Sequence, residues 1–294
     1  MMAGNVDKRG SLVTGQIAHP IPYQGSKRRL APQILAFFPE QVQTLFEPFA
    51  GSGALTLAAA AGQKAQQFAL ADSLPALAAI WSDIIHQPMT LASGYEQLWN
   101  EQRSDPKSHF ERVRAEFNTQ GGSARLLFLL ARCVKNAVRF NSAGEFNQSA
   151  DHRRLGTRPA RMRQHIEGAH ELLAQRTTVE ALDYAQLLEQ ATTHDLVYLD
   201  PPYQGTSTAR DQRYHQILDR DRFVAELEKL RSRSIPLIVS FDGRTGAQTY
   251  GEALPEGLGL RRLELSAGRS TQSTLLGRNQ ETFESLYISP ELVP

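Results

Sequence analysis

The chain has 294 residues, of which 41% are hydrophobic and 21% charged, and its formal net charge is +1. This composition is typical of a globular protein with a substantial core and excludes disorder throughout. No apolar run reaches the roughly 18 to 20 residues that a membrane-spanning helix needs. Residues 1–17, which we expect to be flexible, lack a hydrophobic signal core. We therefore expect a cytoplasmic protein without a membrane partner.

Seven segments have the composition of strands, and helical patterns separate the earlier ones. The strands are expected at residues 44–49, 68–72, 178–182, 195–199, 236–241, 260–265 and 282–288. The helices are expected at residues 26–38, 53–61, 75–86 and 219–233. This alternation predicts an α/β fold with a mostly parallel sheet. The last two strands leave no room for a crossover helix between them, so we expect them to be antiparallel.

The alternation disappears between residues 87 and 176, which we interpret as an inserted helical domain. Its clearest helix is expected at residues 124–140, where apolar residues recur along one face. That stretch includes Cys133, the single cysteine, which is expected to be a buried thiol rather than a nucleophile or metal ligand. Nine basic and two acidic residues lie between Arg125 and Arg163. The basic residues off the apolar stripe are expected to face DNA phosphates or, alternatively, only solvent.

The most informative motif is Asp200-Pro-Pro-Tyr203, which follows the apolar run of residues 196–199. In open α/β sheets, ligands bind at the carboxyl ends of such strands. The two prolines donate no N–H, so backbone carbonyls stay free to accept hydrogen bonds beside the Asp200 carboxylate. Such a pocket suits the amino group of a flat base, with Tyr203 stacked on the ring. The alternative is a proline-rich turn with a capping aspartate.

A second motif, Gly51-Ser-Gly53, lies between an expected strand and an expected helix. Backbone N–H groups at such a helix start can approach a ligand closely. Asp72 ends the next strand, where a carboxylate suits the two hydroxyls of a ribose, as in dinucleotide-binding folds. The alternative for Asp72 is a helix cap.

Three motifs in this order resemble the Dam-like adenine-N6 family of S-adenosylmethionine-dependent DNA methyltransferases. They are Tyr23-Gln-Gly-Ser-Lys27, Phe46-Glu-Pro-Phe-Ala-Gly-Ser-Gly53 and Asp200-Pro-Pro-Tyr203. The resemblance implies a Rossmann-like fold with a mostly parallel seven-stranded sheet and an antiparallel last strand. It also implies a catalytic domain made of residues 18–86 and 177–294, with residues 87–176 as a helical domain that recognises the DNA target.

The same resemblance assigns roles to individual residues. The catalytic residues it implies are Asp200, Pro201, Pro202 and Tyr203. The cofactor-binding residues it implies are Tyr23, Lys27, Phe49, Gly51, Ser52, Gly53, Asp72, Asp183 and Asp200. Ser26 stands where the family usually has a second glycine, which is a small change.

The stretch Arg139-Phe-Asn-Ser-Ala-Gly-Glu-Phe-Asn147 resembles the family's Arg-Phe-Asn…Gly-Phe-Asn element, which implies contact with DNA beside the target base. Glu145 departs from the family's spacing, and Gln148 replaces the proline that commonly follows. The residues we expect to bind DNA are Arg132, Lys135, Arg139, Asn141, Phe146, Asn147, Arg153 and Arg154.

The resulting expectation is a site-specific methyltransferase that modifies N6 of an adenine flipped out of double-stranded DNA. It would convert S-adenosylmethionine to S-adenosylhomocysteine and need no metal, because the sulfonium supplies the leaving group. It would act as an orphan enzyme or beside a separate restriction endonuclease. Cytosine N4, RNA adenine and a protein glutamine amide are alternative acceptors, although Asp at position 200 and the motif order favour DNA adenine. A module that binds cofactor and DNA without catalysis is the alternative outside the enzymes.

Overall fold

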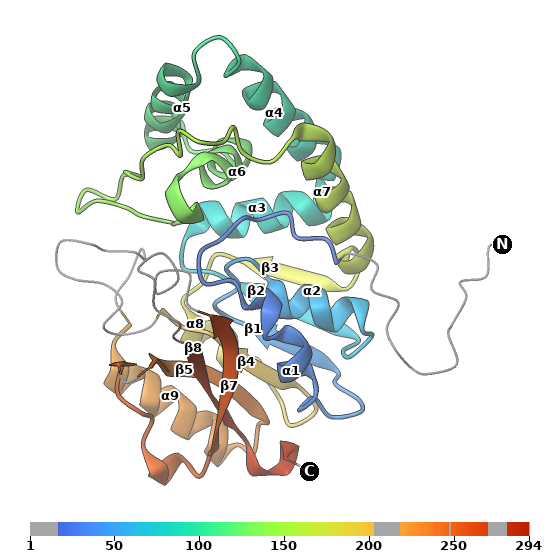
Figure 1. Cartoon of the computed structure of the whole chain (residues 1–294). Coiled ribbons are helices and arrows are strands. Elements are labelled where there is room, and N and C mark those ends of the chain that lie inside the picture. The colour runs from blue at the N-terminus through green and yellow to red at the C-terminus, as the bar shows by residue number, and fades with distance from the viewer. Residues whose placement is uncertain (1–16, 203–217, 247, 270–280, 294) are drawn as a thin grey trace.

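The computed structural model in Figure 1 describes residues 17–202, 218–246, 248–269 and 281–293. Its strands are β1 (Thr44–Glu47), β2 (Gln67–Ala71), β3 (Thr177–Glu180), β4 (Leu196–Leu199), β5 (Leu237–Thr245), β6 (Gln248–Tyr250), β7 (Arg261–Arg269) and β8 (Glu281–Ile288). Its α-helices are α1 (Ala31–Leu35), α2 (Ala54–Ala61), α3 (Pro75–His86), α4 (Pro88–Glu101), α5 (Pro106–Gln120), α6 (Ser123–Arg132), α7 (Pro159–Leu173), α8 (Tyr184–Leu188) and α9 (Arg220–Ser232). Short 3₁₀ helices are η1 (Lys27–Arg29), η2 (Val134–Asn136), η3 (Glu256–Leu258) and η4 (Pro290–Leu292).

The strands form one sheet in the order β3-β2-β1-β4-β5-β8-β7, with the short β6 paired to β5. The first five strands of this order are parallel. Strand β8 runs antiparallel to both β5 and β7, which confirms the antiparallel pairing expected for the last two strands. The sequence patterns did not predict β6. Parallel strands place their carboxyl ends at one edge of the sheet, so the loops after β1, β2, β3 and β4 meet there.

Helices cover both faces of the sheet because successive strand residues point to opposite sides. Leu45 belongs to the hydrophobic core under α1, α2 and α3, whereas its neighbour Phe46 belongs to the core under α8 and α9. The central strand β4 is buried along its whole length. A rigid, fully buried strand thus leads directly into the Asp200 motif.

The expected and observed elements differ mainly in two helices. The helix expected at residues 26–38 is divided into η1 and α1, with a proline in the first turn of α1. The long helix expected at residues 124–140 is wrong, since α6 ends at Arg132. Cys133 adopts an extended conformation, and Lys135 has a φ of 60°, which an α-helix does not accommodate. The remaining expected helices match α2, α3 and α9 closely.

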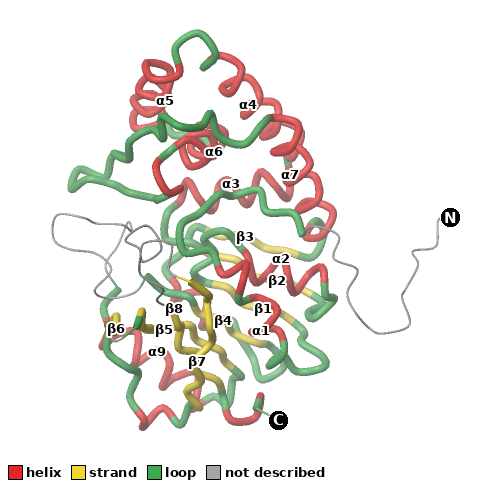
Figure 2. The backbone as a smooth tube through the Cα atoms, viewed as in Figure 1, coloured by secondary structure: helices red, strands yellow, loops and turns green. Residues whose placement is uncertain are grey.

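Helices α4 to α7 form a cap beside the sheet, with α3 lying between the two (Figures 1 and 2). Leu126, Leu127 and Leu130 of α6 belong to the same core as Leu45 of β1. The cap therefore has no separate hydrophobic core and is held in place by α3. None of the described helices combines the length and apolarity needed to cross a membrane.

Candidate active site

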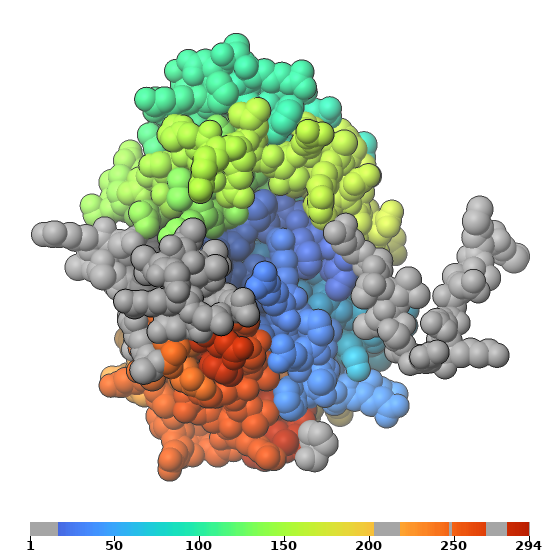
Figure 3. All heavy atoms as spheres, viewed as in Figure 1, coloured from blue at the N-terminus to red at the C-terminus, as the bar shows by residue number. Residues whose placement is uncertain are grey.

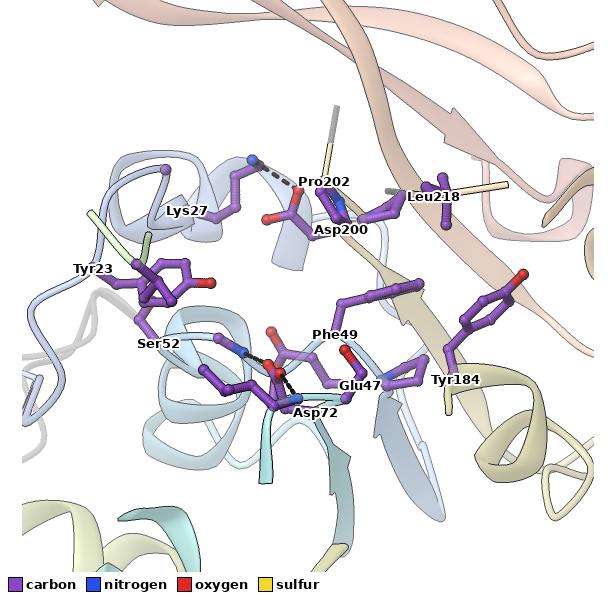
Figure 4. A pocket seen from close by; sticks show the side chains of 18 of the residues that line it. Tyr23, Lys27, Glu47, Phe49, Ser52, Asp72, Tyr184, Asp200, Pro202 and Leu218 are labelled. Atoms are coloured by element: carbon purple, nitrogen blue, oxygen red, sulfur yellow. Dashed lines mark hydrogen bonds and ion pairs between the residues drawn. The ribbon is translucent and has the colours of Figure 1, made fainter. Parts of the chain in front are cut away.

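A cavity opens at the carboxyl ends of the parallel strands (Figure 4). It is lined by residues from the loops after β1, β2, β3 and β4, and by the segment that precedes α1. Asp200, Pro201 and Pro202 follow β4 and all line it. Tyr203 lies outside the described residues. The segments that the sequence motifs identified therefore meet around one space.

Lys27 lies at the centre of a buried charge cluster. Its Nζ is 2.9 Å from Asp200 Oδ1 and 3.2 Å from Glu284 Oε2, and its side chain is only 5% exposed. Burial lowers the pKa of Lys27, but the Asp200 and Glu284 carboxylates outweigh that effect and raise the pKa above its ordinary value. The ammonium therefore stays charged and holds the Asp200 carboxylate at the edge of the cavity.

The loop after β1 turns sharply on two glycines. Gly51 and Gly53 have φ values of 46° and 56°, which side chains other than that of glycine rarely adopt. Ser52 donates its hydroxyl to Ser26 Oγ at 2.8 Å, which ties the loop to the segment before η1. A side chain at Gly51 would contact the Tyr23 ring, because a Cβ there would lie 3.4 Å from Tyr23 Cε1. The loop backbone is thus packed closely beside the cavity.

Asp72 fixes this loop from the neighbouring strand β2. Its Oδ2 accepts the Gly51 N–H at 3.1 Å, and its Oδ1 accepts the Leu74 N–H at 2.9 Å. The Asp72 carboxylate thus joins the glycine loop to the turn between β2 and α3. The N-cap of α3 is Leu74, with no side-chain cap hydrogen bond, so the alternative of a helix-cap role for Asp72 is wrong. The ligand role of Asp72 stays a prediction.

Glu47 is another carboxylate in the cavity wall, and no sequence pattern assigned it a role. It is buried at the end of β1, and its Oε2 accepts both the backbone N–H and the hydroxyl of Thr56. Burial raises the pKa of Glu47 to about 8, against the hydrogen bonds from Thr56 and with a further rise from the charge of Asp200. Glu47 is therefore mostly protonated at neutral pH.

Asp183 lies across the cavity, where it caps α8 by accepting the Ala185 N–H at 3.0 Å. Arg222 of α9 forms a two-pronged ion pair with the Asp183 carboxylate, at 3.0 and 2.5 Å. The same guanidinium lies 5.1 Å from the centre of the Tyr184 ring, which stacks on Phe49. This arrangement presents aromatic surface next to a carboxylate, as recognition of an aminopurine requires.

Two of the residues expected to bind DNA are buried in the cap. Arg132 is only 1% exposed, so the expectation that its side chain faces solvent or DNA is wrong. Its guanidinium donates to Gln102 Oε1 and to the Asp151 and Arg154 carbonyls. Phe146 is also buried, against the rings of Phe117 and Phe140. Both side chains hold the cap together.

Other members of the basic stretch pair within the chain. Arg125 lies 3.3 Å from Glu116, and Arg163 lies 3.0 Å from Glu96. The positive charge of the stretch is therefore partly neutralised by nearby acids that lie outside it in the sequence.

Residues 133–150 form a hairpin without a continuous strand pair. Its two arms are joined by single antiparallel β-bridges, between Cys133 and Ala150 and between Phe140 and Phe146. Asn141 shapes its tip by accepting the Ala143 and Glu145 N–H groups. Among the residues expected to bind DNA, the exposed ones are Lys135, Asn147, Arg153 and Arg154. Figure 1 shows this hairpin projecting from the cap above the β5–β8 side of the sheet.

The strand order, the single reversed strand β8 and a cavity at the carboxyl ends define a Rossmann-like methyltransferase fold. The family model of D12 class N6 adenine-specific DNA methyltransferases matches residues 23–244. The chain belongs to this family. Its methyltransferase membership implies the use of S-adenosylmethionine.

Several relatives carry names related to that of the family. A DNA N-6-adenine-methyltransferase of Escherichia phage P1 is 28% identical over 187 residues, which cover 62% of this chain and 23% of that protein. The Type II methyltransferase M1.LlaDCHI of Lactococcus lactis subsp. cremoris is 26% identical over 194 residues, or 62% of this chain and 64% of that protein. A DNA adenine methylase of Salmonella typhi is 27% identical over 229 residues, which cover 75% of this chain and 79% of that protein. The match thus spans less than two thirds of the first two relatives.

Proposed function

We propose that this chain transfers a methyl group from S-adenosylmethionine to N6 of an adenine flipped out of double-stranded DNA. The observation that carries the proposal is the Asp200 carboxylate, held at the cavity edge by buried Lys27 and followed by two prolines. This arrangement offers hydrogen-bond acceptors to an amino group on a flat base. Membership of an adenine-specific family supports adenine as that base.

The cavity residues suit the cofactor part by part. Asp72 would accept hydrogen bonds from the ribose hydroxyls, and Asp183 would accept one from the adenine amino group. Phe49 and Tyr184 would contact the purine face, as their stacked arrangement permits. Gly51, Ser52 and Gly53 would allow the backbone to approach the methionyl part closely. Tyr23 and Lys27 would line the end nearest Asp200.

The chain's own part in the reaction is mainly positioning. When bound, S-adenosylmethionine supplies an electrophilic methyl group on a sulfonium. Asp200 and the backbone carbonyls beside Pro201 and Pro202 would accept the protons of the target amine, which localises its lone pair for in-line attack. The amine becomes acidic only as the new bond forms, so its proton passes late to Asp200 or to water. Tyr203, outside the described residues, remains the expected stacking partner of the flipped base.

The helical cap, residues 87–176, would bind the DNA and recognise its sequence. Its exposed residues Lys135, Arg153 and Arg154 would contact phosphates, and Asn141 and Asn147 of the hairpin would contact base edges. Arg139 would contact a phosphate or a guanine. In the space-filling view, the cap overhangs the dark-blue N-terminal segment and leaves a hollow between them (Figure 3). Residues 18–86 and 177–294 would then form the catalytic part beneath.

Methyl transfer from labelled S-adenosylmethionine to duplex DNA, RNA and protein acceptors tests this proposal. We expect label in DNA with the natural chain and none with the Asp200→Ala variant. That variant should still bind DNA, because Asp200 lies in the cavity and not on the cap. Label found only in RNA or protein would overturn the proposal, as would turnover by Asp200→Ala. Cofactor binding without any transfer would identify a module that lacks catalysis.

A further inference from the structure

A group of basic side chains lies where the segment before η1 crosses α7. The segment packs closely on this helix, because a Cβ at Gly168 of α7 would lie 3.0 Å from Ala18 Cβ. The group consists of His19, Arg28, Arg161 and His165. It therefore gathers positive charge from two parts of the chain that are far apart in the sequence.

We propose that these four residues form a binding site for a phosphate group of the DNA backbone, separate from the hairpin of residues 133–150. The proposal rests on the function proposed above, because it concerns the DNA that carries the target base. It places a contact with DNA at the junction between the cap and the catalytic part, to which no sequence motif pointed.

His165 and Arg161 present hydrogen-bond donors to each other. The Nδ1 of His165 accepts the backbone N–H of His19 at 3.2 Å, so this nitrogen carries no hydrogen. The hydrogen of a neutral imidazole is then on Nε2. The Nε of Arg161, which always carries a hydrogen, lies 3.3 Å from His165 Nε2. Two N–H donors therefore converge, and one phosphate oxygen could accept both.

The charge of the group also suits an anion. Burial, followed by the charges of Arg28 and His165, lowers the pKa of His19 to about 4. Burial, followed by Arg161 and Arg28, lowers the pKa of His165 as well. Both imidazoles are therefore neutral at pH 7, and the positive charge is that of the two arginines. Within the described ranges, neither arginine forms an ion pair with a carboxylate.

Arg28 differs from an arginine that serves the fold alone. Its Nη2 donates to the Ile21 carbonyl at 2.8 Å, but its Nε is buried without an acceptor, as is Nδ1 of His19. Arg132 in the cap, by contrast, donates from both Nε and Nη1 to acceptors of the chain. Burying a charged donor without an acceptor costs free energy. A phosphate group would offset that cost, because its charge and several oxygens suit a guanidinium.

The position of the group suits DNA as well. Helix α7 belongs to the cap, and the segment before η1 belongs to the catalytic part. In Figure 3 these two parts border the hollow beneath the cap. Further along the same segment, Tyr23 and Lys27 line the cavity of the candidate active site. A duplex whose flipped base enters this cavity would therefore have its backbone close to the segment.

The test compares Arg161→Ala with Arg163→Ala in the full chain, by fluorescence anisotropy with labelled duplex DNA at several salt concentrations. Arg161 is exposed, so its replacement should leave the fold intact. Arg163 is a matched control, because it lies on the same helix but is paired with Glu96 at 3.0 Å. We expect Arg161→Ala to weaken binding severalfold and to reduce the slope of log affinity against log salt by about one. Arg163→Ala removes the same charge and should leave the slope unchanged.

A titration with inorganic phosphate distinguishes DNA from free phosphate as the ligand. Nitrogen-15 NMR follows the imidazoles of His19 and His165, which are assigned with His19→Gln and His165→Gln. A slope that falls in Arg161→Ala alone supports the contact with DNA. Imidazole signals that move with phosphate while the slope stays the same would overturn that contact and indicate a site for free phosphate. Equal slopes together with unmoved signals would overturn the phosphate site altogether.

These measurements require no turnover, so the two proposals can fail separately. A natural chain that binds duplex DNA with the steeper slope but transfers no methyl group would refute the function proposed above and leave the phosphate site supported. A natural chain that methylates DNA with the same slope as Arg161→Ala would refute the phosphate site alone.

Discussion

The indole of Trp81 occupies the space that a side chain on Gly53 would need. A Cβ at Gly53 would lie only 2.5 Å from Trp81 Cζ2. The same indole donates its N–H to the Gly51 carbonyl at 3.0 Å. Helix α3 thus fixes the shape of the glycine loop from the side away from the cavity, and it links that loop to the cap that packs on α3.

Gly53→Ala should therefore disturb both stability and cofactor binding. The clash with Trp81 and the left-handed conformation together should lower the free energy of unfolding by about 2 to 4 kcal/mol. Denaturant unfolding and calorimetric titration with S-adenosylhomocysteine measure the two effects. Gly259→Ala is a matched control, since Gly259 has a similar φ of 64° and nothing within 4 Å of its Cβ. Equal losses in the two variants would show that the Trp81 contact is unimportant.

Arg222→Ala should weaken binding of S-adenosylmethionine about tenfold, which corresponds to about 1.4 kcal/mol. The loss is expected because Arg222 orients the Asp183 carboxylate and covers the Tyr184 ring. Lys229→Ala, an exposed change further along α9, should leave affinity unaltered. Calorimetric titration distinguishes these results. Unchanged affinity in Arg222→Ala would show that Arg222 does not contribute to binding the adenine of the cofactor. Tighter binding would show that Arg222 competes with the cofactor for Asp183.

Glu47 should make the free energy of unfolding decrease as pH rises. Its pKa is raised from 4.5 to about 8 in the folded chain, so the folded state holds a proton that the unfolded state has released across this window. Its contribution to stability is therefore complete below pH 4.5 and is lost as pH rises towards 8, at up to about 1.4 kcal/mol per pH unit. Urea unfolding of the natural chain and Glu47→Gln across this window measures the difference. A difference that does not vary with pH would contradict the buried protonated state.

Arg139→Ala should weaken binding to duplex DNA and reduce the slope of log affinity against log salt by about one if the side chain contacts a phosphate. Arg103→Ala is a suitable control, because Arg103 lies just after α4, over the Trp99 ring and away from the hairpin of residues 133–150. Fluorescence anisotropy with labelled DNA at several salt concentrations gives both affinity and slope. Unaltered affinity at physiological salt would exclude Arg139 from the interface.

Strand patterns were predictable from sequence because burial on both faces leaves a continuous apolar run. The run at residues 196–199 predicted β4, and the next residue, Asp200, lines the cavity as expected. The apolar pattern of α6 gave a wrong prediction for Arg132. This residue lies off the apolar stripe and was expected to be exposed, but it is buried. Its partners are mainly backbone carbonyls, and no periodicity in the sequence encodes such contacts. Cys133 shows the same limit, since its extended backbone ends a helix that composition alone would extend.

Only part of the charge cluster around Lys27 could be predicted from the sequence. Lys27 and Asp200 lie in recognisable motifs, and the structure brings them within 2.9 Å. Glu284 belongs to a strand whose pattern shows only that it is a strand, and its contact with Lys27 depends on the reversed placement of β8 between β5 and β7. Arg222 likewise reaches Asp183 through the packing of α9 against α8, which sequence spacing does not reveal.

The most direct test of the central claim is mass spectrometry of nucleosides from DNA that starts without adenine methylation. That DNA is incubated with S-adenosylmethionine and either the natural chain or Asp200→Ala, and then digested to nucleosides. We predict N6-methyldeoxyadenosine with the natural chain and none with the variant. N4-methyldeoxycytidine in its place would contradict the assignment of adenine as the target base, and equal yields from the two proteins would contradict the role of Asp200.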